Sequence, residues 1–261
     1  MAIAAPPVAR LDRGYVEVSG PDSEDFLERM LSNEIASLQV GPEARPALLL
    51  TPKGRIIASL RVVRETSEAF LLITDAAELA EPVADNLRRA RFASKCEINV
   101  LPWDGFVHFD GDLGPGATPN HDFGVEAFET WGPRGVLQAP VPDAEELEPL
   151  RIEAGTPAWG KEIDGSVLPA EAGLDRTHIS FTKGCYPGQE PVARLHHRGH
   201  PNRRLRLLDI EATEPGAEIR WNEKVVGRVT SAVRGRALAY VRTEVPDDAV
   251  LDVEGVEARL H

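Results

Sequence analysis

Cysteine is scarce in this sequence. The 261 residues include only two cysteines, Cys96 and Cys185. Two thiols this far apart make no disulfide framework, and neither belongs to a pair with the spacing of zinc ligands. We therefore expect a chain that needs neither a disulfide nor a structural metal and that resides in a reducing compartment.

Long apolar runs and a surplus of positive charge are also missing. No stretch approaches the roughly 18 to 20 apolar residues that span a bilayer, and the first residues, MAIAAPPVARLDRG, have no charged flank followed by a hydrophobic segment. The 42 acidic residues outnumber the 29 Lys and Arg, so the net charge is -13. This charge disfavours broad binding to nucleic acid or anionic lipid. We expect a cytoplasmic protein with no membrane partner and no direct nucleic-acid partner.

Common ligand-binding motifs are absent as well. The sequence has no Walker loop, no dinucleotide-binding glycine fingerprint, no Gly-x-Ser-x-Gly elbow and no His-Glu-x-x-His pair. His196 and His197 are adjacent, and on an extended segment adjacent side chains point to opposite sides. Because no second cluster of His, Cys or Asp accompanies them, we predict no metal site.

What is present is a mixture of strands and helices. Alternating apolar residues predict strands, and apolar residues at helical spacing predict helices. This mixture indicates an α+β fold and not a doubly wound parallel sheet. The expected strands lie at residues 15–19, 45–51, 55–64, 69–74, 96–101 and 105–109, with a weaker one at 135–138; the helices lie at 22–35 and from about 75 to 91; residues 110–122 have the composition of a loop.

From residue 201 onward the chain consists of short β-rich pieces separated by turns every ten residues or so, as in a small barrel. We therefore predict an α+β region at 1–200, comprising one unit or two intertwined subdomains, and a small C-terminal β-barrel at 201–261. The expected barrel strands lie at 204–211, 217–221, 224–233, 237–241 and 250–260.

The densest candidate for chemistry is Lys-Gly-Cys-Tyr-Pro-Gly-Gln-Glu at residues 183–190. Two glycines and a proline close together predict a loop around Cys185, and loops on rigid scaffolds often carry function. A lone cysteine is usually a small buried hydrophobe. Here the polar neighbours favour a reactive thiol, with Lys183 and downstream arginines stabilising the thiolate. Cys96 begins an apolar strand and keeps the buried interpretation.

Charge is unevenly distributed near this segment. Residues 183–206 carry six basic residues against one acidic residue, whereas residues 141–175 carry nine acidic residues against two basic ones. Such neighbouring segments can form a cleft for a ligand with an anionic tail and a donor-rich head. A solvated surface with intramolecular ion pairs explains the same pattern equally well.

Residues 183–190 resemble the signature of the YgfZ/GcvT family of folate-binding proteins, in its YgfZ branch. Further similarities cover most of the chain: residues 20–31, 48–55, 151–155, 168–171 and 194–199. The resemblance implies a ring-like aminomethyltransferase (GcvT) fold that ends in a small β-barrel, with tetrahydrofolate or a one-carbon derivative bound near the centre. It also implies a role in the maturation or repair of iron-sulfur enzymes, including enzymes that modify tRNA.

The resemblance assigns roles to individual residues. Glu171 would recognise the pterin ring, since a carboxylate accepts paired N–H donors. Cys185 would act on or near the ligand with Lys183 tuning its thiol, and Tyr186 would stack on the ligand. Arg194 or Arg198 would meet the glutamate tail, and Gln189 and Glu190 would orient the loop or contact the cofactor.

One departure from the family separates the candidate functions. The related aminomethyltransferases carry an acidic pair where this sequence has Ala58 and Ser59, and without that carboxylate glycine cleavage loses its principal acid-base group. We therefore expect a tetrahydrofolate-binding accessory protein that works with iron-sulfur client or assembly proteins. A folate-dependent one-carbon transferase with an unknown acceptor is the alternative, and a thiol scaffold without folate is a third. Two cysteines cannot hold a stable cluster alone, and the acidic chain makes any effect on tRNA indirect.

Overall fold

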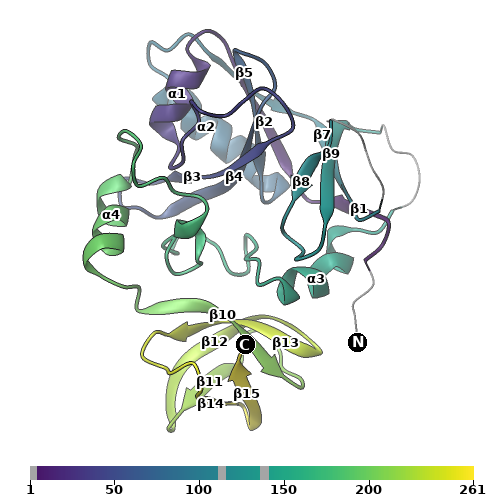
Figure 1. The fold of residues 1–261 in the computed structure, drawn as a ribbon, viewed down its shortest axis with the longest axis vertical. Coiled ribbons are helices and arrows are strands. Elements are labelled where there is room, and N and C mark those ends of the chain that lie inside the picture. Colours follow the sequence, from purple (N-terminus) through teal and green to yellow (C-terminus); the bar gives the residue numbers. More distant parts are fainter. Residues whose placement is uncertain (1–4, 111–115, 136–140) are drawn as a thin grey trace.

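The N-terminal part of the chain forms two antiparallel sheets (Figure 1). The computed structural model describes residues 5–110, 116–135 and 141–261. One sheet has five strands in the order β3-β4-β5-β2-β6, and the other has four in the order β1-β7-β9-β8. Their bounds are β1 Val8–Leu11, β2 Gly14–Ser19, β3 Ala44–Leu50, β4 Ile56–Arg64, β5 Ala69–Thr74, β6 Glu97–Leu101, β7 Trp103–His108, β8 Thr118–Asn120 and β9 Ala127–Pro133.

Two helices cover one face of the five-stranded sheet. They are α1 (Ser23–Met30) and α2 (Ala80–Ala90), the latter preceded by the 3-10 turn η1 (Ala77–Leu79). Phe26 of α1 and Leu87 of α2 are buried in one cluster with Val16, Leu60 and Leu72 of the sheet. The alternation of apolar residues along each strand provides this face, and helical spacing provides the matching stripe on each helix.

A long connection joins the sheets to the C-terminal domain. It contains η2 (Ala144–Leu147), α3 (Glu148–Glu153), η3 (Leu174–Arg176) and α4 (Gln189–Arg198). In Figure 1 the two sheets lie side by side above this connection, and the barrel lies below it. The elements therefore surround a central region to which both sheets and the connection contribute.

The C-terminal residues form a closed six-stranded barrel in the order β10-β13-β12-β11-β14-β15. Leu208, Ile219 and Ala237 are fully buried in its core. Closure leaves no long open sheet edge, which suits a domain of this small size. The strands are β10 Arg203–Ile210, β11 Glu218–Trp221, β12 Lys224–Val233, β13 Gly235–Arg242, β14 Val250–Val253 and β15 Val256–Leu260.

The α+β fold with a terminal barrel confirms the expected fold class, and several element bounds differ. The first helix ends at Met30, although Leu31 and Ile35 are still buried as their spacing predicted. Strands β8 and β9 were not predicted; the strand expected at 135–138 falls almost wholly outside the described residues. The last predicted strand is a hairpin of two strands, with a positive φ at Glu254 and Gly255.

The expectation that His196 and His197 lie on an extended segment is wrong. Both are on α4, where the His196 ring stacks on Phe181 with 3.8 Å between ring centroids and packs edge-on against His197. The helix begins after Gly188, which takes a positive φ of 83° at the N-cap, and Arg198 in its last turn is favourably placed against the helix dipole. The helix therefore begins directly after the glycine and proline residues that predicted a loop.

Gly188 also marks the closest approach between the segment at residues 183–190 and the β3–β4 hairpin. A Cβ on Gly188 would lie 2.5 Å from the Thr51 carbonyl oxygen and 3.1 Å from Gly54 Cα. Both neighbours are backbone atoms, so neither can move as a flexible side chain would. The glycine therefore fixes how the Cys185 loop docks on the hairpin.

We predict that Gly188→Ala lowers the free energy of unfolding by about 1 to 3 kcal/mol, because the new methyl group meets backbone at a positive φ. Gly184→Ala is the matched control, since a Cβ there has no atom within 4 Å, and it should leave stability nearly unchanged. Urea unfolding of both variants measures the difference. Equal stability of the two variants would contradict the close docking.

Candidate functional site

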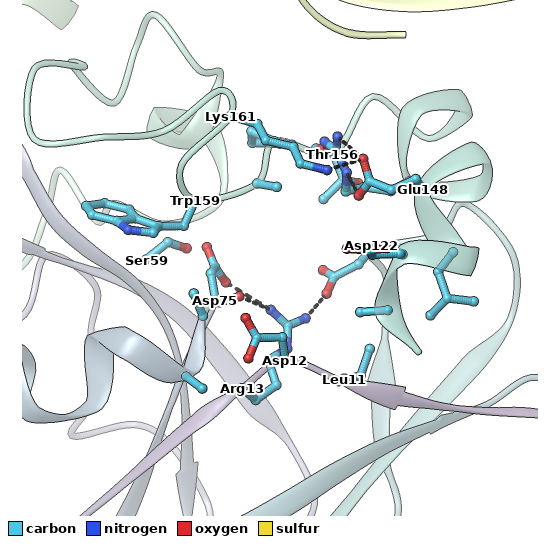
Figure 2. Close-up of a pocket in the computed structure, with 18 of the residues that line it drawn as sticks. Leu11, Asp12, Arg13, Ser59, Asp75, Asp122, Glu148, Thr156, Trp159 and Lys161 are labelled. Carbon is cyan, nitrogen blue, oxygen red and sulfur yellow. Dashed lines mark hydrogen bonds and ion pairs between the residues drawn. The ribbon is translucent and has the colours of Figure 1, made fainter. Parts of the chain in front are cut away.

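A cavity of about 890 Å³ lies where the two sheets meet the connection to the barrel. We call it the central cavity (Figure 2). Its walls come from the link between β1 and β2, the adjacent ends of β4 and β5, the segment after β8, and the segment that contains α3. The residues that line it include Asp12, Arg13, Ser59, Asp75, Trp103, Asp122, Arg134, Glu148, Arg151, Trp159, Lys161 and His178.

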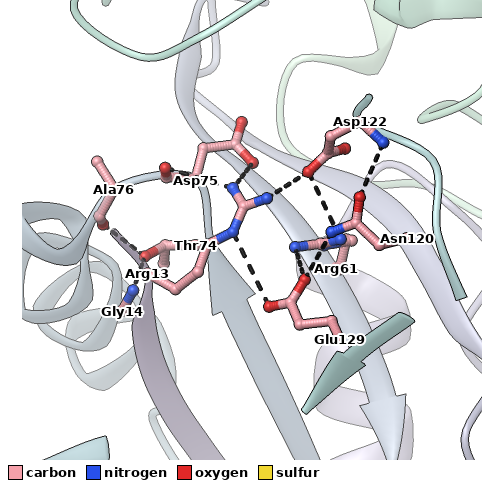
Figure 3. A network of polar contacts seen from close by, with 9 residues as sticks. All are labelled: Arg13, Gly14, Arg61, Thr74, Asp75, Ala76, Asn120, Asp122 and Glu129. Carbon is pink, nitrogen blue, oxygen red and sulfur yellow. Dashed lines mark hydrogen bonds and ion pairs between the residues drawn. The ribbon is translucent and has the colours of Figure 1, made fainter. Parts of the chain in front are cut away.

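Arg13 connects the two sheets at the base of this cavity (Figure 3). It lies on the two-residue link between β1 and β2, which belong to different sheets. Its guanidinium is 3.3 Å from the carboxylate of Asp75, pairs with Asp122, and has its Nε 3.9 Å from Glu129. Asp75 follows a strand of the five-stranded sheet, and Glu129 belongs to the four-stranded sheet, so one arginine holds both.

A second arginine completes the charge cluster. Arg61 of β4 pairs with Glu129 and lies 3.6 Å from Asp122. Asn120 donates to Glu129 at 2.9 Å and accepts the backbone N–H of Asp122 at 2.9 Å. Two guanidiniums and three carboxylates thus share one mostly buried region, where an isolated charge would be strongly penalised.

The pKa values of Asp75 and Asp122, two carboxyls of the cluster, shift in opposite directions. Burial raises the pKa of the Asp75 carboxyl, and the neighbouring Arg13 only partly offsets that effect. Burial would also raise the pKa of Asp122, but Arg61 and Arg13 outweigh burial and lower it. Burial lowers the pKa of Arg13 less than Asp122, Glu129 and Asp75 raise it. Of Asp75 and Asp122, Asp75 is therefore the carboxyl that more readily takes up a proton.

Asp75 lies beside Ser59, a position where the sequence lacks the expected acid. Leu60 is opposite Thr74 in the β4–β5 ladder, so Ser59 and Asp75 are neighbours across the strands, and both line the cavity. Ser59 lowers the pKa of the Asp75 carboxyl slightly, against the larger effect of burial. A carboxyl group is present in this part of the cavity, on the neighbouring strand.

Trp159 and His178 supply ring surfaces to the cavity. The half-buried Trp159 donates its indole N–H to Glu78 at 3.0 Å, which fixes the ring. Burial lowers the pKa of His178 to about 4. The imidazole is therefore neutral at physiological pH and can donate or accept one hydrogen bond without bringing a charge.

The side of the cavity near the barrel is held by a separate network. Arg151 of α3 makes a bidentate pair with Glu148 at 2.8 and 2.9 Å, contacts Glu162 at 2.9 Å and donates to Ser231 of β12 at 2.8 Å. Lys161 pairs with Glu148 at 2.7 Å. Because Ser231 belongs to the barrel, this network fixes the barrel against α3.

Glu171, the predicted pterin anchor, does not line the central cavity. One carboxylate oxygen accepts the Leu168 N–H at 2.9 Å, and the other accepts Arg203 Nε at 3.0 Å. It lines a different cavity, on the barrel side. Glu171 therefore closes its own turn and secures the start of β10, and Cys185 lines neither this cavity nor the central cavity.

Lys183 has a different environment from the one predicted. Its Nζ donates to the carbonyl oxygens of Glu28, Leu31 and Asn33 at 2.7 to 2.8 Å and lies 3.2 Å from the Glu28 carboxylate. Burial lowers the pKa of this ammonium, and Glu28 partly opposes the shift. Cys185 is exposed two residues later. Lys183 thus anchors the loop to the end of α1, and its ammonium is directed to these carbonyls and not to the thiol.

Tyr186, which the resemblance suggested would stack on a ligand, is buried in this structure. Its ring packs among Leu48, Ile56 and Val192, and burial raises the pKa of its hydroxyl to about 12. The remaining predicted contacts lie on α4: Gln189 is half-buried, and Glu190, Arg194 and Arg198 are exposed. None of these residues lines the central cavity.

Four residues of the central cavity were not predicted from the sequence: Arg13, Asp75, Asp122 and His178. Arg13 and Asp75 each adjoin an apolar strand end, a position where polar residues often carry function. That signal does not identify partners, because Arg13 and Asp122 are 109 residues apart in the chain. Only the pairing of strands across two sheets brings them together.

The chain is similar in sequence to several known proteins. Residues 202–261 match the family described as CAF17, C-terminal beta-barrel domain. An uncharacterized protein of Haemophilus influenzae is 29% identical over 249 residues, which cover 89% of this chain and 86% of that protein. The mitochondrial iron-sulfur cluster assembly factor IBA57 homolog of Mycosarcoma maydis is 30% identical over 235 residues, covering 79% of this chain and 58% of that protein.

A solved structure shares the fold. The glycine cleavage system aminomethyltransferase T from Bartonella henselae matches with a TM-score of 0.84 at 20% sequence identity, covering 97% of this chain and 84% of that one. These similarities agree with the resemblance to the YgfZ/GcvT family. They confirm the predicted resemblance and the predicted GcvT-like fold with a C-terminal barrel. The chain spans only 58% and 57% of the fungal IBA57 homologs from Mycosarcoma maydis and Chaetomium globosum.

Within residues 5–110, 116–135 and 141–261, no three His, Cys, Asp or Glu side chains gather as candidate metal ligands. No helix in those ranges is long and apolar enough to cross a membrane.

We predict that His178 makes the protein less stable as the pH falls from about 6.5 to 4. The folded state binds this proton less readily than the unfolded state, whose histidine pKa is near 6.5, so stability rises with pH through that window. His178→Gln should remove about 1 to 3 kcal/mol of the pH-dependent loss. Urea unfolding at pH 7 and pH 4.5 measures it, with exposed His197→Gln as control. An unchanged pH profile in His178→Gln would contradict the burial of a neutral imidazole.

Proposed function

We propose that this protein binds tetrahydrofolate or a one-carbon derivative in the central cavity and supports the maturation or repair of iron-sulfur enzymes. The observation that carries the proposal is the central cavity, which combines sufficient space, an aromatic wall and a carboxyl group. Its volume of about 890 Å³ lies in the range of small-molecule sites. The shared GcvT fold supports a folate as the ligand class.

The residues of the cavity fit the chemistry of a folate. The Asp75 carboxylate accepts paired N–H donors of a pterin edge, and the fixed ring of Trp159 offers a face for an aromatic group. Lys161 and Arg134 are cations at 46% and 70% side-chain exposure, suited to the carboxylates of a glutamate tail. We therefore assign to Asp75 the pterin contact that the sequence suggested for Glu171, and to Lys161 and Arg134 the tail contacts suggested for Arg194 and Arg198.

The iron-sulfur part of the proposal rests on the relatives and on Cys185. Several relatives are described as iron-sulfur cluster assembly factors. Cys185 is exposed on a loop that Lys183 and Gly188 dock firmly. One exposed thiol cannot hold a cluster alone, so it acts together with iron-sulfur client or assembly proteins. An effect on tRNA modification would be indirect, and a cytoplasmic location stays a prediction, since the fungal relatives are mitochondrial.

A one-carbon transferase is the second candidate, and Asp75 is the observation that favours it. Its raised pKa makes it a candidate general acid or base in place of the acid missing at Ala58 and Ser59. Incubating the protein with methylene-tetrahydrofolate and candidate amines, and following the folate species, tests for turnover. Conversion at catalytic rates would favour the transferase over the accessory factor.

We predict that Asp75→Asn weakens tetrahydrofolate binding about 10- to 100-fold, because it removes a charge-assisted pair of hydrogen bonds. Glu171→Gln should change the affinity less than about twofold, since Glu171 lies outside the central cavity. Isothermal titration of the two variants measures this. A loss of affinity in Glu171→Gln but not in Asp75→Asn would return the pterin contact to Glu171.

A transplanted carboxylate separates recognition from fold damage. Ser59→Asp in the Asp75→Asn background places an acid directly across the β4–β5 ladder. We expect it to restore at least part of the lost affinity, whereas Ser59→Asn in the same background should not. Failure of both double variants, with unfolding free energies like that of Asp75→Asn, would show that the carboxyl at Asp75 acts structurally.

We predict that Cys185→Ser fails to restore iron-sulfur enzyme activity in a strain that lacks this protein, because a serine hydroxyl does not replace a thiolate in contacts with an iron-sulfur partner. Cys96→Ser is the control that also removes a thiol, at a buried position directly before β6. Aconitase-type activity in extracts, with immunoblots for protein level, provides the measurement. Full restoration by Cys185→Ser would remove the thiol from the function.

A further inference from the structure

A second cavity lies beside the barrel, away from the proposed folate site. Its volume is about 1190 Å³, and it lies between the start of β10, the end of β13 and the turn that follows β13. Four arginines line it: Arg203, Arg204 and Arg206 from β10, and Arg242 from β13. These β10 arginines are half of the basic residues of the cationic segment at 183–206. Half of that segment's basic residues therefore lie at this second cavity and not at the central cavity.

The arginines are placed in a way that costs stability without an anion. Arg203 lies directly opposite Arg242 in the antiparallel ladder, and like charges in opposite positions are destabilising. Arg203 is partly compensated by Glu171 at 3.0 Å and by the ring of Tyr240, 4.5 Å from its guanidinium carbon. Departures from ordinary pairing rules are expected at functional sites.

The other arginines have only weak compensation. Arg242 lies 3.8 Å from Glu244, and both side chains are more than 60% exposed. Arg206 pairs at 2.8 Å with Asp247, whose side chain is 86% exposed. Arg204 is exposed and forms no ion pair with any described residue. Exposed ion pairs contribute little and exchange readily for a better-matched anion.

The lining distinguishes between kinds of anion. Phosphate sites usually combine a cation with backbone N–H groups from a glycine-rich loop or a helix N-terminus, and the described lining of this cavity includes no glycine and no helical residue. Four guanidiniums spread over two strands match separate carboxylates along a chain, each of which an arginine can bind in a bidentate manner.

We propose that this barrel-side cavity is a docking site for an acidic peptide segment of a partner protein, bound through Arg203, Arg204, Arg206 and Arg242. The charge supports this occupant, because a protein of net charge -13 repels acidic partners over most of its surface and attracts them where arginines gather. The proposal does not depend on folate in the central cavity. It gives an accessory factor a surface for its partner that is separate from its ligand site.

Fluorescence anisotropy with a labelled hexaglutamate peptide and the full-length protein tests this proposal. We expect saturable binding that weakens with salt. Arg204→Ala combined with Arg242→Ala should weaken binding about tenfold, since two arginine-carboxylate contacts are lost. Arg220→Ala combined with Arg228→Ala is the matched control, with the same change of net charge at barrel residues that pair with Glu218, and it should change the affinity less than about twofold.

Two further variants should bind hexaglutamate more tightly, a result that damage to the fold would not produce. Glu244→Gln and Asp247→Asn remove the weak internal partners of Arg242 and Arg206, so each should tighten hexaglutamate binding about two- to threefold. Equal losses in the two double-alanine variants, or no binding of hexaglutamate, would overturn the proposal. Tripolyphosphate that binds in this cavity more tightly than hexaglutamate would also overturn it, because the site would then be a phosphate site.

Discussion

The ion pairs of Arg13 hold together the two sheets on which the central cavity depends. The residue lies on a link of only two residues between sheets, and its guanidinium contacts carboxylates from both. Removing one partner from such a buried cluster leaves uncompensated charges and costs far more than an exposed pair. The relative position of the sheets, and with it the shape of the cavity, is therefore specified by charge complementarity as much as by apolar packing.

The same constraint explains why a carboxyl of the cavity lies directly after β5. Arg13 requires carboxylates at the base of the cavity, and Asp75 meets that requirement while its side chain still lines the cavity. Positions 58 and 59 on β4 need not be acidic for a carboxyl to be present there. Asp122 pairs with both Arg13 and Arg61, and these two arginines lower the pKa of its carboxyl. Within the cluster, the pKa of Asp122 is therefore lowered whereas the pKa of Asp75, which also lines the cavity, is raised.

How far the sequence predicts this protein depends on the range of the interactions. Strands such as β4 and β5 and the barrel follow from apolar periodicity, because that pattern is local. The loop at Cys185 was predicted from Gly184, Pro187 and Gly188, and its exposure agrees. The role of Lys183 was not predicted, since its ammonium meets carbonyls about 150 residues earlier in the chain. The contact of Glu171 with Arg203 was not predicted for the same reason. The two residues become adjacent only when the barrel packs on the connection.

The family signature at residues 183–190 combines two physical tasks that the motif alone does not separate. Lys183, Tyr186 and Gly188 are buried or in close contact with α1 and the β3–β4 hairpin, so substitutions there change the docking of the loop. Cys185 is exposed between these anchors. A rigid attachment on both sides lowers the entropy that an exposed side chain loses when it meets a partner. The anchors thus give the thiol a defined position while leaving it accessible, which is the arrangement that a transient contact with another protein requires.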